Sequence, residues 1–336
     1  MRFAKVSHAL SGAVRALLGM FCWVGVATSS FAQEFPSRQV TLLVGFVAGS
    51  ATDSVARLVT QYLGEKFKTP ILVDNKPGAG ALIAVQVLKK SAPDGYTLML
   101  GTGGTLVQNP GVQKNISYDP VADFVPVVAV GKAGGILAVR NSLAVSNVKE
   151  LVEYLKKNPG KATYGSAGVA AAGHLNGEYF VHHTGTSMVH VPYKGANQVA
   201  VDLIAGRLDF VITNVSSVLP FVLNGKVKAL AVTSQTRLRT APDIPTLAET
   251  GFPGLEGLDP FTFYGIVGPV GMPSAAVARV NQASNEMLKN PEFLAKLASL
   301  DFDAVAPNSP ADFGRFLASQ LAVWRELGSR IKIDIQ

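Results

Sequence analysis

The fold is decided by the stretch Val40-Thr-Leu-Leu-Val-Gly-Phe-Val-Ala-Gly-Ser-Ala-Thr-Asp53, in which an apolar strand runs into a glycine-containing loop. A helical run, Ser54–Phe67, follows at once. The N–H groups that open a helix have no partner inside it and lie at the positive end of its dipole, so such a loop can bind an anion. The same residue types also serve ordinary turns, which is the alternative for either loop taken alone.

A second copy of this design lies further along the chain. The short strand Ala162–Tyr164 leads into Gly165-Ser-Ala-Gly168, and a helix is predicted over Gly173–His182. Two such loops, far apart in the sequence, can close on one small anion from opposite sides. We therefore expect one anion site built from both loops.

Strands and helices alternate through most of the chain after residue 33. Val40–Val44, Ile71–Val73 and Tyr96–Leu100 are short, nearly continuous apolar runs, which are typical of a parallel sheet covered on both faces. Phe124–Val130 and Gly135–Val139 are β-rich runs separated by glycines, as expected where a chain crosses between lobes. The pattern predicts an α/β fold.

We expect two lobes with a cleft between them. The pattern assigns residues 33–128 and 236–336 to the first lobe and residues 129–235 to the second. Small ligands bind in such clefts, and in parallel sheets they bind beyond the carboxyl ends of the strands. Both glycine loops lie at those ends.

The first 32 residues have the features of a secretory signal peptide. A basic start precedes the apolar run Ala16–Ala27, and the small residues Ser30 and Ala32 predict cleavage after Ala32. The only cysteine, Cys22, lies in this leader. We therefore expect a periplasmic protein that has no disulfide and depends on its core for stability.

Composition excludes several functions. The formal net charge is +7, but the basic residues are scattered rather than arranged in a stripe with aromatic residues, which argues against a nucleic-acid partner. Gly78-Ala-Gly80 resembles the start of a dinucleotide-binding motif, yet Ile83 stands where the third glycine belongs. We predict no cofactor.

Two other classes of function remain as alternatives. An exported hydrolase would use Ser50 or Ser166 with His174, but no motif supplies the acid that orients such a histidine. A zinc-binding protein would use His174, Glu178 and His182, which share one helix face. The two histidines lie about 12 Å apart along that helix and cannot share one ion, so we predict no metal.

Several motifs follow one another in a characteristic order. They are Phe46…Gly49-Ser-Ala-Thr-Asp53, Val73-Asp-Asn-Lys-Pro-Gly-Ala-Gly80, Ala92-Pro-Asp-Gly-Tyr-Thr-Leu98, Gly165-Ser-Ala-Gly168 with His174-Leu175, and His190-Val-Pro-Tyr-Lys-Gly195. From about Phe35 to the C-terminus the chain resembles the Bug family, which are periplasmic solute-binding receptors of tripartite tricarboxylate transporters.

The resemblance implies a type II periplasmic-binding ("Venus flytrap") fold with no enzymatic activity. Such a receptor holds a small organic carboxylate mainly through backbone N–H groups of the two loops and delivers it to a membrane permease by transient contact. We expect it to act as a monomer. The predicted ligand-binding residues are Phe46, Ser50, Ala51, Thr52, Asp53, Gly103, Ser166, Ala167, Gly168, His174 and Asn214.

Departures from the family pattern bear on the ligand. Ser50 stands where relatives usually have glycine, Ala170–Ala172 where they often have hydroxyls, and Thr213 where they often have aspartate. Phe46 and the Phe261–Tyr264 run can supply an apolar wall. Because a second buried carboxylate needs hydrogen-bond partners, we predict a monocarboxylate or aromatic carboxylate rather than citrate, aspartate or glutamate.

Overall fold

The computed structural model describes residues 35–113, 115–169, 171–255, 258, 262–300 and 302–330. The chain forms two units, Met1–Glu34 and Phe35–Gln336. The first unit lies outside the described residues, and with it the expected signal peptide, its cleavage site and Cys22. Within the described part, no helix combines the length and the apolar character needed to cross a membrane.

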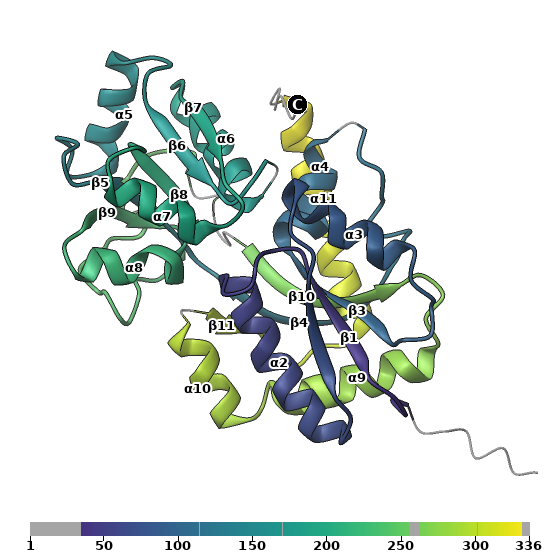
Figure 1. Ribbon diagram of the computed structural model, residues 1–336. Coiled ribbons are helices and arrows are strands. Elements are labelled where there is room, and N and C mark those ends of the chain that lie inside the picture. Colours follow the sequence, from purple (N-terminus) through teal and green to yellow (C-terminus); the bar gives the residue numbers. More distant parts are fainter. Residues whose placement is uncertain are drawn as a thin grey trace, which may run out of the picture. The chain divides into compact units, whose positions relative to one another are not determined.

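The first sheet has six strands in the order β11-β4-β10-β3-β1-β2 (Figure 1). Strand β1 pairs in parallel with β2 and β3, as the apolar runs predicted, whereas β10 is antiparallel to β3 and β4. The strands are β1 (Val40–Val44), β2 (Ile71–Asn75), β3 (Thr97–Thr102), β4 (Phe124–Ala133), β10 (Thr262–Pro269) and β11 (Phe302–Ala304).

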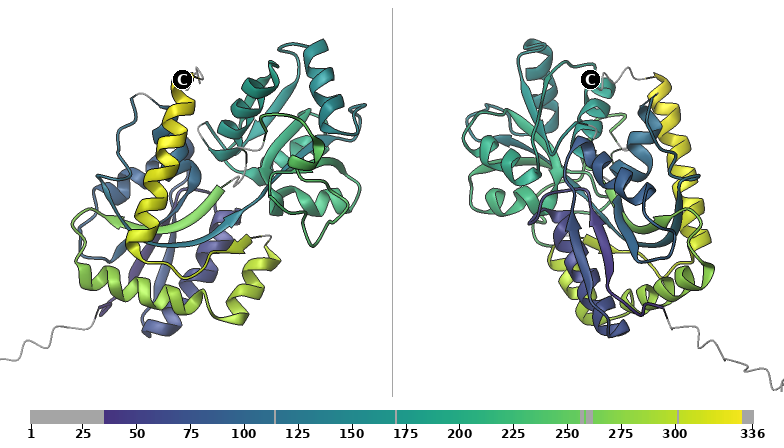
Figure 2. Two further views of the ribbon diagram at one scale, coloured as in Figure 1. Left: turned by 180° about the vertical axis from the view of Figure 1, so that it is seen from behind. Right: turned by 45° about the vertical axis from the view of Figure 1, so that its right-hand side comes forward.

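Helices cover both faces of this sheet, which is why its central strands are almost wholly apolar. One face packs against α2 (Ala51–Phe67), α9 (Ser274–Met287) and α10 (Pro291–Ser299). The other face packs against α3 (Leu82–Lys89), the π-turn η2 (Gly104–Gln108), the short α4 (Asn109–Val112) and the long α11 (Pro310–Arg330), which is yellow in Figure 2.

The second sheet has five strands in the order β7-β6-β8-β5-β9. Strand β6 is parallel to β7 and β8, and β5 is antiparallel to β8 and β9. The strands are β5 (Gly135–Arg140), β6 (Thr163–Ser166), β7 (Val189–Pro192), β8 (Phe210–Asn214) and β9 (Val227–Val232). Helices α5 (Val148–Lys157) and α6 (Ala172–Thr184) cover one face, and α7 (Ala196–Ile204) and α8 (Val215–Leu223) the other.

The chain passes between the sheets by one very short crossing and one long one. Gly134 alone separates β4 in the first sheet from β5 in the second. The return runs from β9, through the 3-10 turn η3 (Ala248–Thr250), to β10. The lobe division at residues 128 and 235 stays a prediction; the strands place the first change of sheet at Gly134.

Candidate functional site

The first glycine loop joins β1 to α2 and is braced by its own side chains. Ser50 caps the helix: its Oγ accepts the N–H of Asp53 at 3.2 Å. Asp53 in turn accepts the N–H of Gly49 at 2.9 Å, so two backbone donors are satisfied reciprocally. These two predicted ligand residues therefore shape the loop.

Asp53 is the centre of this bracing. Its carboxylate also accepts Arg57 Nε at 2.8 Å and Asn75 Nδ2 at 3.0 Å, and only 2% of the residue is exposed. Burial by itself raises the pKa of Asp53, but hydrogen bonds from Arg57, Gly49 and Asn75, together with the charge of Arg57, outweigh it and hold that pKa below its ordinary value. The group is an anion at neutral pH and is neutralised locally.

The second loop is held by Ser166 at the end of β6. Ser166 Oγ donates to the carbonyl of Gly168 at 2.8 Å and lies 2.6 Å from His190 Nε2. Because a hydroxyl has one hydrogen and a carbonyl can only accept, His190 Nε2 must carry the proton and donate to Ser166. His190 is therefore no general base for Ser166, and the hydroxyl fixes the loop.

His174 stacks on His190 behind this loop. The two rings lie 3.9 Å apart with an interplanar angle of 7°, and Tyr164 lies against His190 at 4.9 Å. Burial, with a smaller contribution from the neighbouring His190, lowers the pKa of His174 to about 3. Burial also lowers the pKa of His190 to about 4. Both imidazole rings are therefore neutral at pH 7, and they pack against each other behind the second loop.

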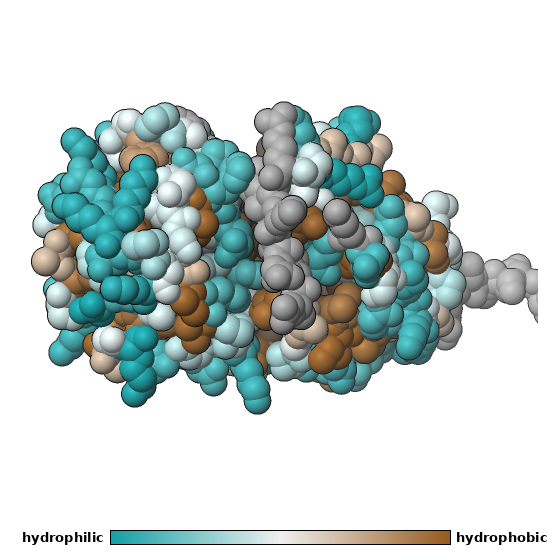
Figure 3. Space-filling view, turned by 90° about the horizontal axis from the view of Figure 1, so that it is seen from above, coloured by the Kyte–Doolittle hydropathy of each residue, from teal (hydrophilic) through white to brown (hydrophobic). Residues whose placement is uncertain are grey.

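Both loops reach one pocket between the two sheets. It encloses about 40 Å³, room for about three water molecules. The space-filling view from above shows a furrow separating the two lobes (Figure 3). The described residues that line the pocket include no charged side chain: they are Phe46, Ser50, Ala51, Thr52, Thr102, Ala167, Ala171, Ala172, Gly173, Ala196, Thr213, Asn214, Thr262 and Tyr264.

The pocket gathers six of the eleven predicted ligand residues: Phe46, Ser50, Ala51, Thr52, Ala167 and Asn214. The other five, Asp53, Gly103, Ser166, Gly168 and His174, do not line it. Gly103 lies next to Thr102, but its N–H donates to Thr262 Oγ1 at 3.1 Å. These five residues support the pocket wall in this structure. Phe261 and Ala170, invoked for the ligand class, lie outside the described residues.

The pocket wall is made largely of helix beginnings. Ala51 and Thr52 open α2, Ala172 and Gly173 open α6, and no hydrogen bond among the described residues uses the N–H of any of these four. The first residue of α7, Ala196, and the residue before α8, Asn214, also line it. The described lining therefore offers backbone donors and positive dipole ends without a cationic side chain.

Tyr264 was predicted only as part of an apolar wall, yet it also brings a hydroxyl group to the pocket lining. It lies on β10 and is 1% exposed. Burial raises the pKa of Tyr264, while hydrogen bonds from the side chains of Thr52 and Asn214 act in the opposite direction. The sequence carried no signal for this, because the three residues come from three separate elements.

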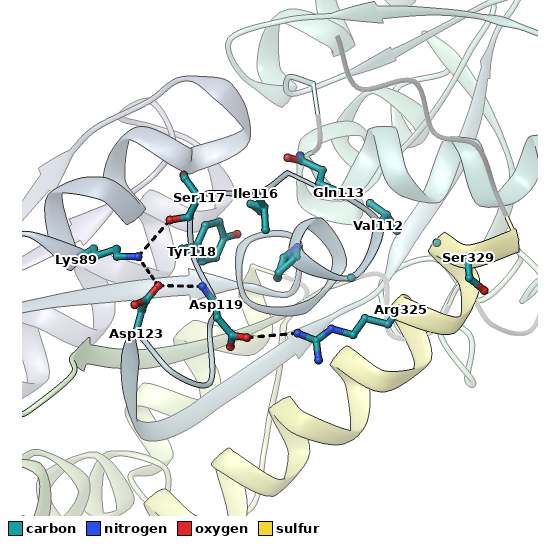
Figure 4. A pocket seen from close by; sticks show the side chains of 13 residues that line it. Lys89, Val112, Gln113, Ile116, Ser117, Tyr118, Asp119, Asp123, Arg325 and Ser329 are labelled. Carbon is teal, nitrogen blue, oxygen red and sulfur yellow. Dashed lines mark hydrogen bonds and ion pairs between the residues drawn. The ribbon is translucent and has the colours of Figure 1, made fainter.

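A larger hollow lies elsewhere, on the surface of the first lobe beside α4 and α11 (Figure 4). It measures about 680 Å³. Its cations are already paired: Lys89 Nζ lies 2.7 Å from Asp123, and Arg325 lies 3.4 Å from Asp119. It is not at the end of the parallel strands, so the smaller pocket is the better candidate for an anion.

The zinc alternative finds no geometric support. Among the described residues, no three His, Cys, Asp or Glu side chains group so as to hold a metal ion. Of the three proposed ligands, Glu178 accepts the hydroxyl of Tyr164 at 2.6 Å. His174 Nε2 lies 4.0 Å from the Glu178 carboxylate.

The two sheets, the two crossings that join them and the pocket at the strand ends define a two-lobed solute-binding protein. A profile of the "Tripartite tricarboxylate transporter family receptor" matches residues 55–333, so the chain belongs to this family. The predicted family and the two-lobed periplasmic-binding fold are thus confirmed.

Three solved structures are similar to most of the chain, each with a TM-score of 0.81. An R. palustris protein solved with adipate is 32% identical and covers 88% of this chain and 97% of its own. The periplasmic binding protein BugD is 31% identical, with 88% and 98% covered. MatC from Rhodopseudomonas palustris, with bound malate, is 27% identical, with 88% and 100% covered.

Proposed function

We propose that this chain is an exported receptor that captures a small organic carboxylate in the pocket between its two sheets and hands it to a membrane permease. The observation that carries the proposal is a set of four N–H groups, of Ala51, Thr52, Ala172 and Gly173, that no hydrogen bond among the described residues uses, at one pocket whose described lining has no charged side chain. Helix beginnings of this kind bind carboxylates. The adipate-bound and malate-bound relatives support the same ligand class.

The predicted ligand residues take two roles in this proposal. Ala51, Thr52 and Ala167 bring backbone to the anion, Phe46 and Asn214 line the remaining wall, and Ser50 does both. The other five residues do not touch the ligand and instead hold the loops and β3 in place: Asp53, Ser166, Gly168, His174 and Gly103.

The receptor acts without catalysis. Ser50 is occupied as a helix cap and Ser166 as an acceptor from His190, so neither hydroxyl has a base directed at it. Purified protein is therefore expected to bind carboxylates without turning over carboxylate esters. Ester hydrolysis that disappears in Ser50→Ala or Ser166→Ala would favour the hydrolase instead.

Export and delivery complete the proposal. The leader directs the chain to the periplasm and is removed after Ala32, and the monomeric receptor then contacts the permease only transiently. N-terminal sequencing of protein from the periplasmic fraction should begin at Gln33. An intact Met1 or a lipid on Cys22 would contradict it.

The ligand is a monocarboxylate rather than citrate, aspartate or glutamate. The described residues that line the pocket bring neutral polar groups, but no cation for a second carboxylate and no acid for an ammonium group. Its enclosed volume of about 40 Å³ favours a short acid over an aromatic one. Phe46 and the aromatic ring of Tyr264 remain as the apolar part of the wall.

Isothermal titration calorimetry of the mature protein tests the class of ligand directly. Short monocarboxylates should bind and citrate, aspartate and glutamate should not, at equal ionic strength. If citrate or glutamate binds tightly and monocarboxylates do not bind, the neutral lining does not select a monocarboxylate. Binding of no carboxylate at all would refute the proposed function itself.

A further inference from the structure

The amide of Asn214 has one polar atom that the protein does not use. Asn214 ends β8 and precedes α8, but its side chain makes no capping hydrogen bond to that helix. Its Oδ1 is buried and has no hydrogen-bond partner among the described residues. A buried acceptor left without a donor is costly, so such an atom at a pocket needs an explanation.

The same amide lies close enough to Tyr264 to affect its ionisation. Burial raises the pKa of Tyr264, and interactions with the side chains of Thr52 and Asn214 lower it by a smaller amount. Asn214 and Tyr264 both line the pocket, and Oδ1 is the atom of the amide that has no hydrogen-bond partner among the described residues.

Tyr264 can supply a hydrogen. Burial raises its pKa, so the hydroxyl is protonated at neutral pH. The hydroxyl can therefore donate to an anion in the pocket. Tyr264, which brings a donor, and Asn214, which brings the unused acceptor, line this one pocket from two different sheets.

We propose that the ligand is a short 2-hydroxy monocarboxylate. Its carboxylate accepts hydrogen bonds from the helix N–H groups and from the Tyr264 hydroxyl, and its own hydroxyl donates to Asn214 Oδ1. This rests on the proposed function, because it specifies the ligand of the same pocket. Because Oδ1 is buried in this structure, the pocket must open from its present volume of about 40 Å³ for the hydroxyl to reach that atom.

A 2-amino acid would present a donor in the same position but fits less well. Its ammonium group would lie among the beginnings of α2, α6, α7 and α8, whose dipoles disfavour a cation. No described residue that lines the pocket carries a carboxylate to balance the charge. A neutral hydroxyl satisfies Asn214 without that cost.

Calorimetric titrations with matched acids test the proposal. Lactate should bind at least about tenfold more tightly than propionate, and glycolate than acetate, because only the hydroxy acids satisfy Oδ1. L-Alanine should bind more weakly than lactate. Equal affinities for lactate and propionate would overturn the hydroxy-acid proposal while leaving carboxylate capture intact; binding of neither acid would overturn both.

Two variants separate the contacts. Asn214→Leu should bring lactate down to the affinity of propionate, so that the preference disappears. Tyr264→Phe should weaken both acids by a similar factor and keep their ratio, because it removes only a carboxylate donor. Should Asn214→Leu melt well below the wild type, Asn214→Ala gives the same decision: it also removes the acceptor, so the lactate preference should disappear. A preference that survives Asn214→Leu in folded protein would overturn the role of Asn214.

Discussion

Replacing Ala51 with proline removes a single N–H group from the pocket and little else. Ala51 is the first residue of α2, the position at which proline is best tolerated in a helix. The preceding Ser50 already has φ −72° and ψ 163°, which a following proline requires. The N–H that is lost has no partner in the described protein, so the fold should lose no hydrogen bond.

The expected cost to binding follows from the charge of the ligand. A hydrogen bond to a charged group contributes about 1.5–3 kcal/mol, and each 1.4 kcal/mol changes affinity tenfold. Ala51→Pro should therefore weaken binding of a short monocarboxylate about 10- to 100-fold in calorimetric titration. The melting temperature should stay within a degree or two of wild type.

Two control variants make the result interpretable. Ser274→Pro places the same residue at the exposed start of α9, far along the chain from both loops, and should leave affinity unchanged. Ala51→Val adds bulk at the pocket but keeps the N–H, and should weaken binding much less than proline does. If folded Ala51→Pro binds the acid as wild type does, the backbone of this loop does not hold the carboxylate.

Three further predictions use the same structure. Thr52→Pro should reduce affinity far more than Ser50→Ala, whose cost of about 1 kcal/mol should appear in urea unfolding instead, because Ser50 Oγ caps α2; equal losses of affinity would argue against a backbone anion site. Stability should fall by about 5 kcal/mol between pH 7.5 and pH 4.5, since burial lowers the pKa of His174 to about 3 and of His190 to about 4, so the unfolded chain binds these two protons first, at about 1.4 kcal/mol per pH unit for each ring. Urea unfolding at both pH values should show this, and His190→Gln should flatten the dependence; a flat wild-type profile would show that the rings are not buried as neutral groups. Gly177→Ala should lower the melting temperature by several degrees, because a Cβ there would lie 2.3 Å from the ring of Tyr164, whereas Gly185→Ala meets no atom within 4 Å and is limited to its backbone cost.

The sequence predicted the parallel strands because their burial on both faces leaves an unbroken apolar signal. Val40–Val44 is the clearest case, with the observed bounds equal to those expected. β11 was not predicted, since Phe302–Ala304 is three residues long and only Phe302 is buried. The π-turn Gly104–Gln108 was also missed, because its hydrogen bonds depend on packing against α11 and α6 rather than on a local pattern.

The candidate site could be predicted only as far as local chemistry reaches. The two loops could be predicted because glycine, serine and aspartate stand between a strand and a helix. Ala51 and Thr52 could be predicted as ligand residues because they begin that helix. The local sequence could not predict the hydrogen-bond partner of Ser166. His190 reaches it from β7 because Ser166 and His190 lie on adjacent parallel strands, whose register the sequence does not give.

The division of the donors between two sheets bears on how such a receptor can both capture and release its ligand. Ala51 and Thr52 belong to the helix after β1, and Ala172 and Gly173 to the helix after β6. An anion bound by all four is stabilised only while the two sheets stay close. When they separate, half of the donors leave the anion, and at about 1.5–3 kcal/mol for each charged hydrogen bond its affinity falls by several orders of magnitude. A single buried lysine would hold the anion in either state. Neutral backbone donors on both sides therefore make affinity depend on closure, which is the property a receptor needs in order to give its ligand to a permease.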